Sequence, residues 1–139
     1  MTLKRVVITG LGAVTPIGNT IPEFWDSVVN GKSGAAPITN FNTETILTKT
    51  KFACEVKNFD LSLYMDRKEA RKVDKYTHFA IGAAVQAIED ASIDKEKENL
   101  DRIGVVLGVG LGGVESFGEG IDTIHEQKKN GQELKVTPF

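Results

Sequence analysis

A short apolar run near the start of the chain leads directly into three spaced glycines. The run is Val6–Thr9, and the glycines are Gly10, Gly12 and Gly18. Consecutive apolar and β-branched residues without polar alternation are typical of a strand that is buried on both faces, as in a parallel sheet. Such a strand needs cover on each side, so the run predicts an α/β protein.

The region after the glycines carries the signals of a helix. Thr20 and Glu23 have the spacing of a capping box, with Pro22 in the first turn. The predicted helix runs through Trp25 and stops at Gly31. A loop rich in Gly, Ser, Pro and Asn is predicted to follow it.

The remaining pattern continues the alternation of strands and helices. Residues 51–59 alternate in part and predict a half-buried strand near a sheet edge. A long helix is expected over 66–92, a second apolar strand over 103–109 and a last helix over about 121–130, ended by Gly131. Small residues at helical spacing in the long helix indicate close approach of another helix or sheet: Ala80, Ala83, Ala84, Ala87 and Ala91.

Composition places the chain among ordinary globular proteins. The 139 residues are 40% hydrophobic and 26% charged, with a net charge of -2, which fits one domain without a linker. This charge predicts no nucleic-acid partner, and no apolar run approaches the roughly 18 residues of a membrane helix. The start of the chain lacks the layout of a signal peptide, and the single cysteine, Cys54, excludes an internal disulfide. A cytoplasmic protein is expected.

The glycine turn invites comparison with nucleotide-binding loops. A dinucleotide fingerprint needs a third glycine where this chain has Thr15, and it needs a helix that starts before Thr20. No Gly-Lys-Ser/Thr triplet ends the turn, so a P-loop is excluded as well. A structural role is favoured, in which glycines allow close packing, and no cofactor is predicted.

The same opening segment, residues 5–19, resembles the start of the β-ketoacyl-acyl-carrier-protein synthases, and synthase II in particular. These are the condensing enzymes of fatty acid synthesis. The resemblance continues in order along the whole chain, through Trp25, Gly31–Gly34, Phe52–Ala53, Arg67–Glu69, Arg71–Lys72, Asp74, Arg102–Gly104, Gly110–Gly113 and Thr137–Phe139.

The resemblance implies a thiolase-like fold, with αβαβα layers in the full enzyme, of which residues 1–139 form an incomplete N-terminal domain. It implies a homodimeric acyltransferase that condenses an acyl-enzyme thioester with malonyl-acyl carrier protein, with loss of carbon dioxide. The nucleophilic cysteine and both catalytic histidines are expected beyond Phe139. The 139-residue piece is therefore predicted to be inactive alone, and to aggregate through exposed strand edges and apolar patches.

Two features of the family are expected within the chain. Lys68, Arg71 and Lys72, with Lys75, have offsets that place them on one helical face. The charges alone would fit a solvated helix start, but these residues match the family's docking positions for the acidic acyl carrier protein, so the resemblance favours docking. Leu111 matches the residue that gates the acyl pocket near the dimer interface, where the alternative is a plain turn after a strand.

Other reactive residues are predicted to have no catalytic role. The strand pattern places Cys54 in an apolar, buried setting, where thiols are usually inert. His78 and His125 lie on predicted helices without metal-ligand partners at suitable spacing, so no metal is expected. Two other functions remain: a non-enzymatic α/β module that binds an acidic protein through its basic helix and, more remotely, a dinucleotide enzyme.

Overall fold

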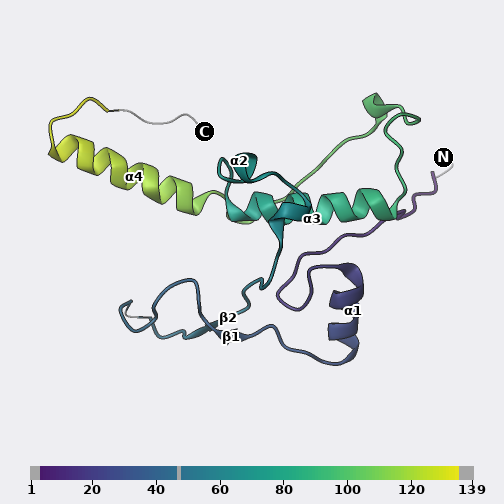
Figure 1. Ribbon diagram of the computed structural model, residues 1–139, viewed down its shortest axis with the longest axis horizontal. Helices are drawn as coiled ribbons and strands as arrows, with labels where there is room; N and C mark the ends of the chain where they lie inside the picture. The colour runs from purple at the N-terminus through teal and green to yellow at the C-terminus, as the bar shows by residue number, and fades with distance from the viewer. Residues whose placement is uncertain (1–3, 47, 135–139) are drawn as a thin grey trace.

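The computed structural model describes residues 4–46 and 48–134, so Thr137–Phe139 lie outside the described part. Figure 1 shows an elongated arrangement, in which α4 runs away from one end of the central helix α3. The α1 helix and the strands β1 and β2 lie together on one side of α3. The elements are α1 (Ile21–Val29), β1 (Ala36–Pro37), β2 (Phe52–Ala53), α2 (Arg67–Ala70), α3 (Lys75–Asp90) and α4 (Val114–Lys129), with 3-10 turns at Leu61–Leu63 and Leu100–Arg102.

The first helix forms as its capping signals predict. Thr20 has an extended backbone, and its hydroxyl accepts a hydrogen bond from the Glu23 amide at 3.4 Å. The Glu23 carboxylate in turn accepts from the Asn19 amide at 2.8 Å, so two amides at the helix start are satisfied. The helix ends at Val29, and Gly31 follows with φ +62°, a conformation that glycine adopts without strain.

The predicted continuous helix over 66–92 is wrong, because the chain forms two helices there. Asp66 and Asp74 both have extended backbones at N-cap positions, so each starts its own helix. The Asp66 carboxylate accepts from two amides of α2, at 2.8 and 3.1 Å. His78 then joins the two helices, since its Nε2 lies 2.9 Å from the carbonyl oxygen of Ala70.

The small residues of α3 allow another segment to approach closely, as predicted, but that segment is the glycine-rich one and not a helix or sheet. A Cβ on Gly12 would lie 1.9 Å from the carbonyl oxygen of Ala83, and one on Gly10 would lie 2.3 Å from that of Ala87. Only glycine fits at such distances from a rigid backbone. Gly10 and Gly12 are therefore packing residues.

The Gln86 side chain of α3 holds the glycine-rich segment in place through hydrogen bonds. Its side-chain oxygen accepts from the Ala13 amide at 3.3 Å, and its side-chain nitrogen donates to the Asn19 carbonyl at 2.8 Å and to the Tyr64 hydroxyl at 3.2 Å. These contacts join three parts of the chain, which lie 22 to 73 residues from Gln86 in sequence. One amide side chain thus fixes the path of the segment before α1.

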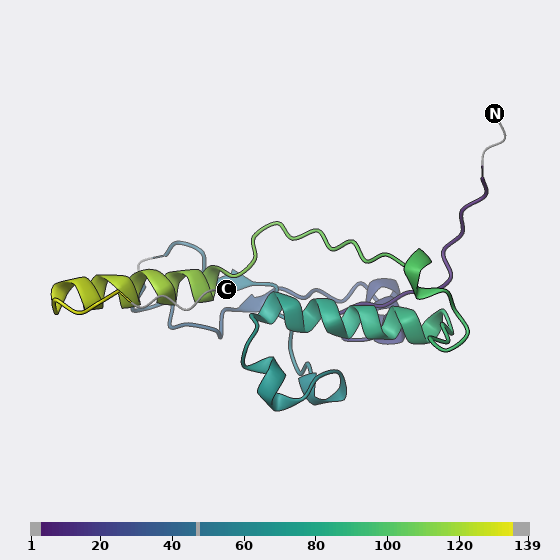
Figure 2. The ribbon, with the colours of Figure 1, turned by 90° about the horizontal axis from the view of Figure 1, so that it is seen from above.

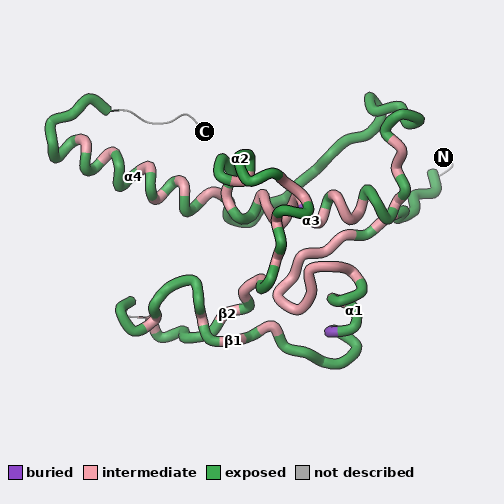
Figure 3. Tube along the Cα trace, in the orientation of Figure 1, coloured by how far each residue is buried: buried purple, intermediate pink, exposed green. Residues whose placement is uncertain are grey.

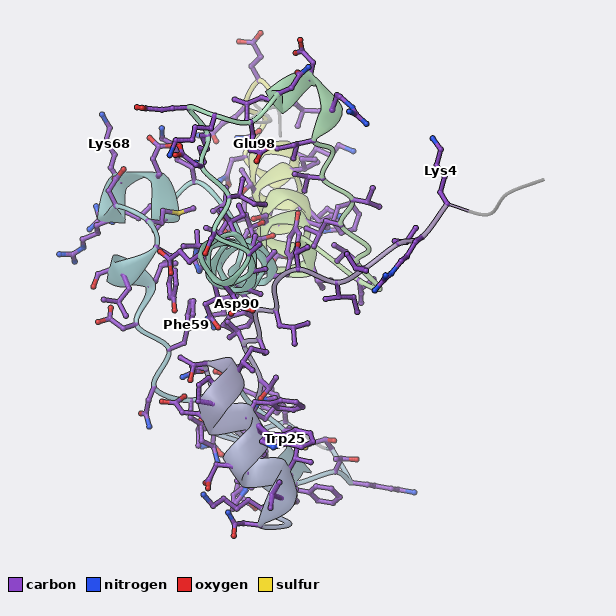
Figure 4. All side chains as sticks on the ribbon, turned by 90° about the vertical axis from the view of Figure 1, so that its right-hand side faces the viewer. Lys4, Trp25, Phe59, Lys68, Asp90 and Glu98 are labelled. Atoms are coloured by element: carbon purple, nitrogen blue, oxygen red, sulfur yellow. The ribbon has the colours of Figure 1, made fainter. Side chains whose placement is uncertain are left out.

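A small aromatic cluster packs on the same helix. The Phe59 ring stacks on Tyr64 and meets Phe79 edge-on, with centroid distances of 5.5 Å in both pairs. Gly82 leaves room for this ring, because a Cβ there would lie 2.7 Å from Phe59 Cζ. Figure 4 shows Phe59 beside the axis of α3. The cluster thus joins the segment before α2 to the middle of α3.

The predicted strands at Val6–Thr9 and 103–109 do not form. Among the described residues, the only sheet is the antiparallel pair β1–β2, with Ala36 opposite Ala53. Val6 is 89% exposed and Val106 is 99% exposed. Figure 2 shows the segment before α4 running along the side of α3 as an open loop. A strand exists only when a neighbour takes up its backbone hydrogen bonds, and no described segment does so here.

Two smaller expectations also need correction. The predicted strand at 51–59 is reduced to Phe52–Ala53, and Phe52 and Cys54 are exposed rather than buried. The last helix begins at Val114, well before the predicted 121, and continues through two glycines. Glycine in an exposed helix costs only about 1 kcal/mol against alanine, so the glycines do not stop it.

The described residues contain no buried apolar side chain. Ser27 and Gly82 are the buried positions among them, and all other described residues are at least partly exposed (Figure 3). A domain of this length normally buries about two thirds of its surface. The described residues therefore leave many large apolar side chains exposed. No helix within the described ranges is long and apolar enough to cross a membrane.

Candidate functional site

The predicted basic residues lie at one end of α3, but not on one helical face. Lys68 belongs to α2, Arg71 caps that helix, Lys72 lies in the turn and Lys75 begins α3. All four are exposed, and Figure 4 shows Lys68 pointing away from the rest of the molecule. The break between the helices removes the regular spacing, so the single-face prediction is wrong. The charges still form one short basic segment, defined here as residues 67–75.

Much of the positive charge in this segment is unpaired. Lys72 contacts Glu69 at 2.5 Å, whereas Lys68 and Arg71 make no ion pair with any described residue. An exposed pair such as Lys72–Glu69 contributes little stability, roughly 0–1 kcal/mol, and opens easily for another anion. The basic segment can therefore present several cations to an acidic surface, which steers and orients a charged partner.

Leu111 lies in a glycine turn that leads into α4. It is 82% exposed, so the described residues do not enclose it. Gly110 has open space where a Cβ would be, and Gly113 has φ +66° directly before the helix. The turn has the conformational freedom that glycines give, and the Leu111 side chain projects from it.

The structure brings the basic segment and the Leu111 turn to the same end of α3. The Ser116 hydroxyl of α4 lies 2.5 Å from the Asp74 carboxylate, which starts α3. Figure 1 shows α2 and the beginning of α4 beside this end of α3. Sequence reasoning missed Ser116, because the two residues are 42 positions apart and no local pattern pairs them.

Several backbone amides of the glycine turn already have partners and are not free to bind a phosphate. The Leu11 amide donates to the Asp90 carboxylate at 2.9 Å, and the Ala13 amide donates to Gln86. The Thr15 and Gly18 amides bond to each other's carbonyls. A nearby cavity of about 510 Å³ is lined mostly by polar residues, but the Thr15 and Gly18 amides on its wall already have hydrogen-bond partners. This arrangement supports the packing role of the glycines.

Cys54 and His78 line one cavity, whereas His125 lies outside it. The Cys54 thiol is exposed, so its predicted burial is wrong, and it lines a cavity of about 560 Å³ together with His78 and Lys75. His78 holds α2 against α3, while His125 is exposed on α4. Within the described ranges, no cluster of three or more His, Cys, Asp or Glu residues could hold a metal ion.

The loop opposite β2 is fixed by a carboxylate. Glu55 accepts from the Thr39 hydroxyl at 2.7 Å and from the Thr39 and Asn40 amides at 3.1 to 3.2 Å. The Thr39 hydroxyl is the main cause that lowers the pKa of Glu55 below its ordinary value of 4.5, and the two amides add to it. This carboxylate acts as a structural anchor for the loop.

Residues 3–139 match the sequence profile of the β-ketoacyl synthase N-terminal domain. The chain belongs to the β-ketoacyl synthase family. Curated relatives called 3-oxoacyl-[acyl-carrier-protein] synthase 2 occur in several bacteria. The Synechocystis protein is 47% identical over 111 residues, which is 80% of this chain and 26% of the relative. The Vibrio cholerae protein is 40% identical over 139 residues, 100% of this chain and 32% of the relative. The chain thus spans less than a third of these relatives.

Solved ketosynthases share the fold of this family member. The ishigamide ketosynthase/chain length factor matches with a TM-score of 0.69 and 25% identity, over 95% of this chain and 32% of that one. A type II polyketide ketosynthase, solved in complex with its acyl-carrier protein, matches with a TM-score of 0.69 and 23% identity, over 95% of this chain and 33% of that one. The predicted thiolase-like fold class is confirmed.

Proposed function

We propose that this chain is the N-terminal part of a 3-oxoacyl-acyl-carrier-protein synthase of fatty acid biosynthesis. The observation that carries the proposal is 40–41% identity to synthase 2 relatives over 98–100% of the chain. The whole enzyme would be an acyltransferase that condenses an acyl-enzyme thioester with malonyl-acyl carrier protein. Decarboxylation of the malonyl group leaves a carbanion, which attacks the thioester carbonyl and releases the cysteine thiolate.

In this proposal, residues 1–139 supply binding surfaces and no catalytic group. The nucleophilic cysteine and both catalytic histidines belong to the rest of the enzyme, so the piece alone has no condensing activity. Homodimer assembly and a cytoplasmic location remain predictions. The alternative of a non-enzymatic module is not favoured, because the close relatives are synthases by name.

The basic segment is the proposed docking surface for the acyl carrier protein. Its cations are exposed, and Lys68 and Arg71 are unpaired among the described residues. A solved ketosynthase of the same fold is bound to its acyl-carrier protein, which supports the kind of partner. Attraction between opposite charges speeds encounter and falls with added salt.

A triple charge reversal in the full-length enzyme tests the docking surface. Lys68, Arg71 and Lys72 are each changed to Glu, and affinity for the acyl carrier protein is measured by surface plasmon resonance at low and high salt. We expect at least a roughly tenfold loss at low salt that shrinks as salt is added. The control reverses three other exposed lysines, Lys95, Lys128 and Lys129, with the same change in net charge. Unchanged affinity in the first variant would refute the docking surface.

Leu111 is the proposed gate of the acyl pocket. A larger ring at this position should block long acyl chains and leave short ones, because the extra atoms occupy the path of the chain. We expect Leu111→Phe in the full enzyme to lose activity with long acyl-carrier substrates, whereas Leu111→Ile keeps the wild-type profile. Equal use of long chains by wild type and Leu111→Phe would show that the gate assignment is wrong.

A further inference from the structure

Asp74 lies at the start of α3, yet its carboxylate does not cap that helix. Its backbone has the extended conformation of an N-cap residue, with φ −75° and ψ 163°, but the side chain makes no hydrogen bond to the first-turn amides. The carboxylate accepts instead from the Ser116 hydroxyl at 2.5 Å. Both residues are half-buried. A charge-assisted bond of this kind is stronger than a neutral one, and it joins the starts of two helices.

The Leu111 turn rests on the same first turn of α3. A Cβ on Gly113 would lie 3.3 Å from the second carboxylate oxygen of Asp74, and one on Gly112 would lie 3.1 Å from the Tyr76 ring. Asp74 and Tyr76 therefore lie directly against the two glycines that follow Leu111. Glycines leave a turn many conformations, so contacts with α3 must select one.

The α4 helix offers no cap of its own to hold the turn. Gly113 stands at its N-cap position and has no side chain, so the helix start lacks a side-chain hydrogen bond there. Ser116, in the first turn of the helix, is the α4 hydroxyl that binds Asp74 at the start of α3. The other α4 hydroxyl with a hydrogen bond, that of Thr123, donates only to the Glu119 carbonyl within the helix. Of these two hydroxyls, only that of Ser116 links α4 to the start of α3.

We propose that Ser116 is a positioning residue for acyl chain-length selection. By binding Asp74, it holds the Gly110–Gly113 turn against α3 and so restricts where Leu111 can lie. This proposal rests on the gate role of Leu111 proposed above. Without the Ser116 hydroxyl, the turn samples more conformations, and Leu111 admits longer acyl chains.

Three variants of the full-length enzyme test the role of Ser116. Ser116→Ala removes the hydroxyl, Ser116→Thr restores one, and Thr123→Ala removes a hydroxyl from the same helix without touching Asp74. The measurement is the ratio of kcat/KM for a 16-carbon and an 8-carbon acyl-carrier substrate. We expect Ser116→Ala to raise this ratio about five-fold, the effect of one hydrogen bond. Ser116→Thr and Thr123→Ala should keep the wild-type ratio, and the KM for malonyl-carrier protein should not change.

The outcomes separate this inference from the gate assignment. If Leu111→Phe leaves long-chain use unchanged, the gate itself is wrong. If Leu111→Phe blocks long chains while Ser116→Ala keeps the wild-type ratio, only the role of Ser116 is overturned. Should Ser116→Ala fail to fold, Ser116→Val and Ser116→Thr form a second pair of nearly equal shape. An equal ratio in those two variants would also overturn the inference.

Discussion

Replacing Gly12 by alanine tests the close packing of the glycine-rich segment on α3. The new Cβ would lie 1.9 Å from the carbonyl oxygen of Ala83 and 2.8 Å from the amide nitrogen of Ala87. Both atoms belong to the helix backbone, which cannot move aside as a flexible side chain can. The segment must therefore lift from α3.

The magnitude follows from what the lifted segment loses. The Leu11 amide leaves Asp90 and the Ala13 amide leaves Gln86, which are bonds of 2.9 and 3.3 Å. Two hydrogen bonds at about 1 kcal/mol each and an overpacking cost of about 1–3 kcal/mol sum to about 3–5 kcal/mol. Local opening becomes easier by this amount, which is roughly a hundredfold or more in the opening equilibrium.

Hydrogen–deuterium exchange of a peptide covering residues 9–14 measures this opening in the full-length protein. We expect the Leu11 and Ala13 amides to exchange at least roughly a hundredfold faster in Gly12→Ala than in wild type. Gly118→Ala is the matched control, because nothing lies within 4 Å of its added Cβ and no residue of α4 is buried. Exchange within a factor of two of wild type in Gly12→Ala would refute the packing role.

Three further predictions concern the hydrogen bonds of Gln86, the pH dependence of the Glu55 contacts and self-association through exposed apolar residues. Gln86→Leu leaves the Asn19 carbonyl and the Ala13 amide without their partner, so the protein should lose about 2–4 kcal/mol, measured from its urea midpoint; Gln86→Glu, which keeps the acceptor, should lose less. The pKa of Glu55 is lowered in the folded protein, so the loop contacts of its carboxylate are present above its ordinary pKa of 4.5 and weaken as pH falls below that value. NMR shifts of the Asn40 amide should follow this titration and lose it in Glu55→Gln. The 139-residue chain alone should self-associate through apolar residues such as Val106, which is 99% exposed; a monodisperse monomer in sedimentation would contradict this.

Local signals predicted the parts of the fold that depend on neighbouring residues. The Thr20–Glu23 pair and Gly31 lie within a few positions of the helix they bound, so their spacing alone specified α1. The same logic failed over 66–92, because two possible N-caps, Asp66 and Asp74, lie in one charged stretch. Both of them begin a helix, and the amphipathic pattern does not encode the turn that separates the two helices.

The predicted strands at Val6–Thr9 and 103–109 show a different limit. Their apolar sequences are typical of strands in the interior of a sheet. In this chain, however, the apolar side chains of both segments are exposed. A strand needs a neighbouring segment, because its backbone hydrogen bonds are made to that neighbour and not within the strand itself. The sequence can identify such a segment, but it forms a strand only when a neighbouring segment pairs with its backbone.

The sequence by itself determined the family, the capping of α1 and the positions of the basic residues and Leu111. Those features are carried by residue types in a fixed order along the chain. Tertiary structure alone decided that Gly12 meets the Ala83 backbone and that Ser116 binds Asp74. Contacts between residues 42 or 71 positions apart depend on how distant segments pack in space, and no local pattern in the chain records that geometry.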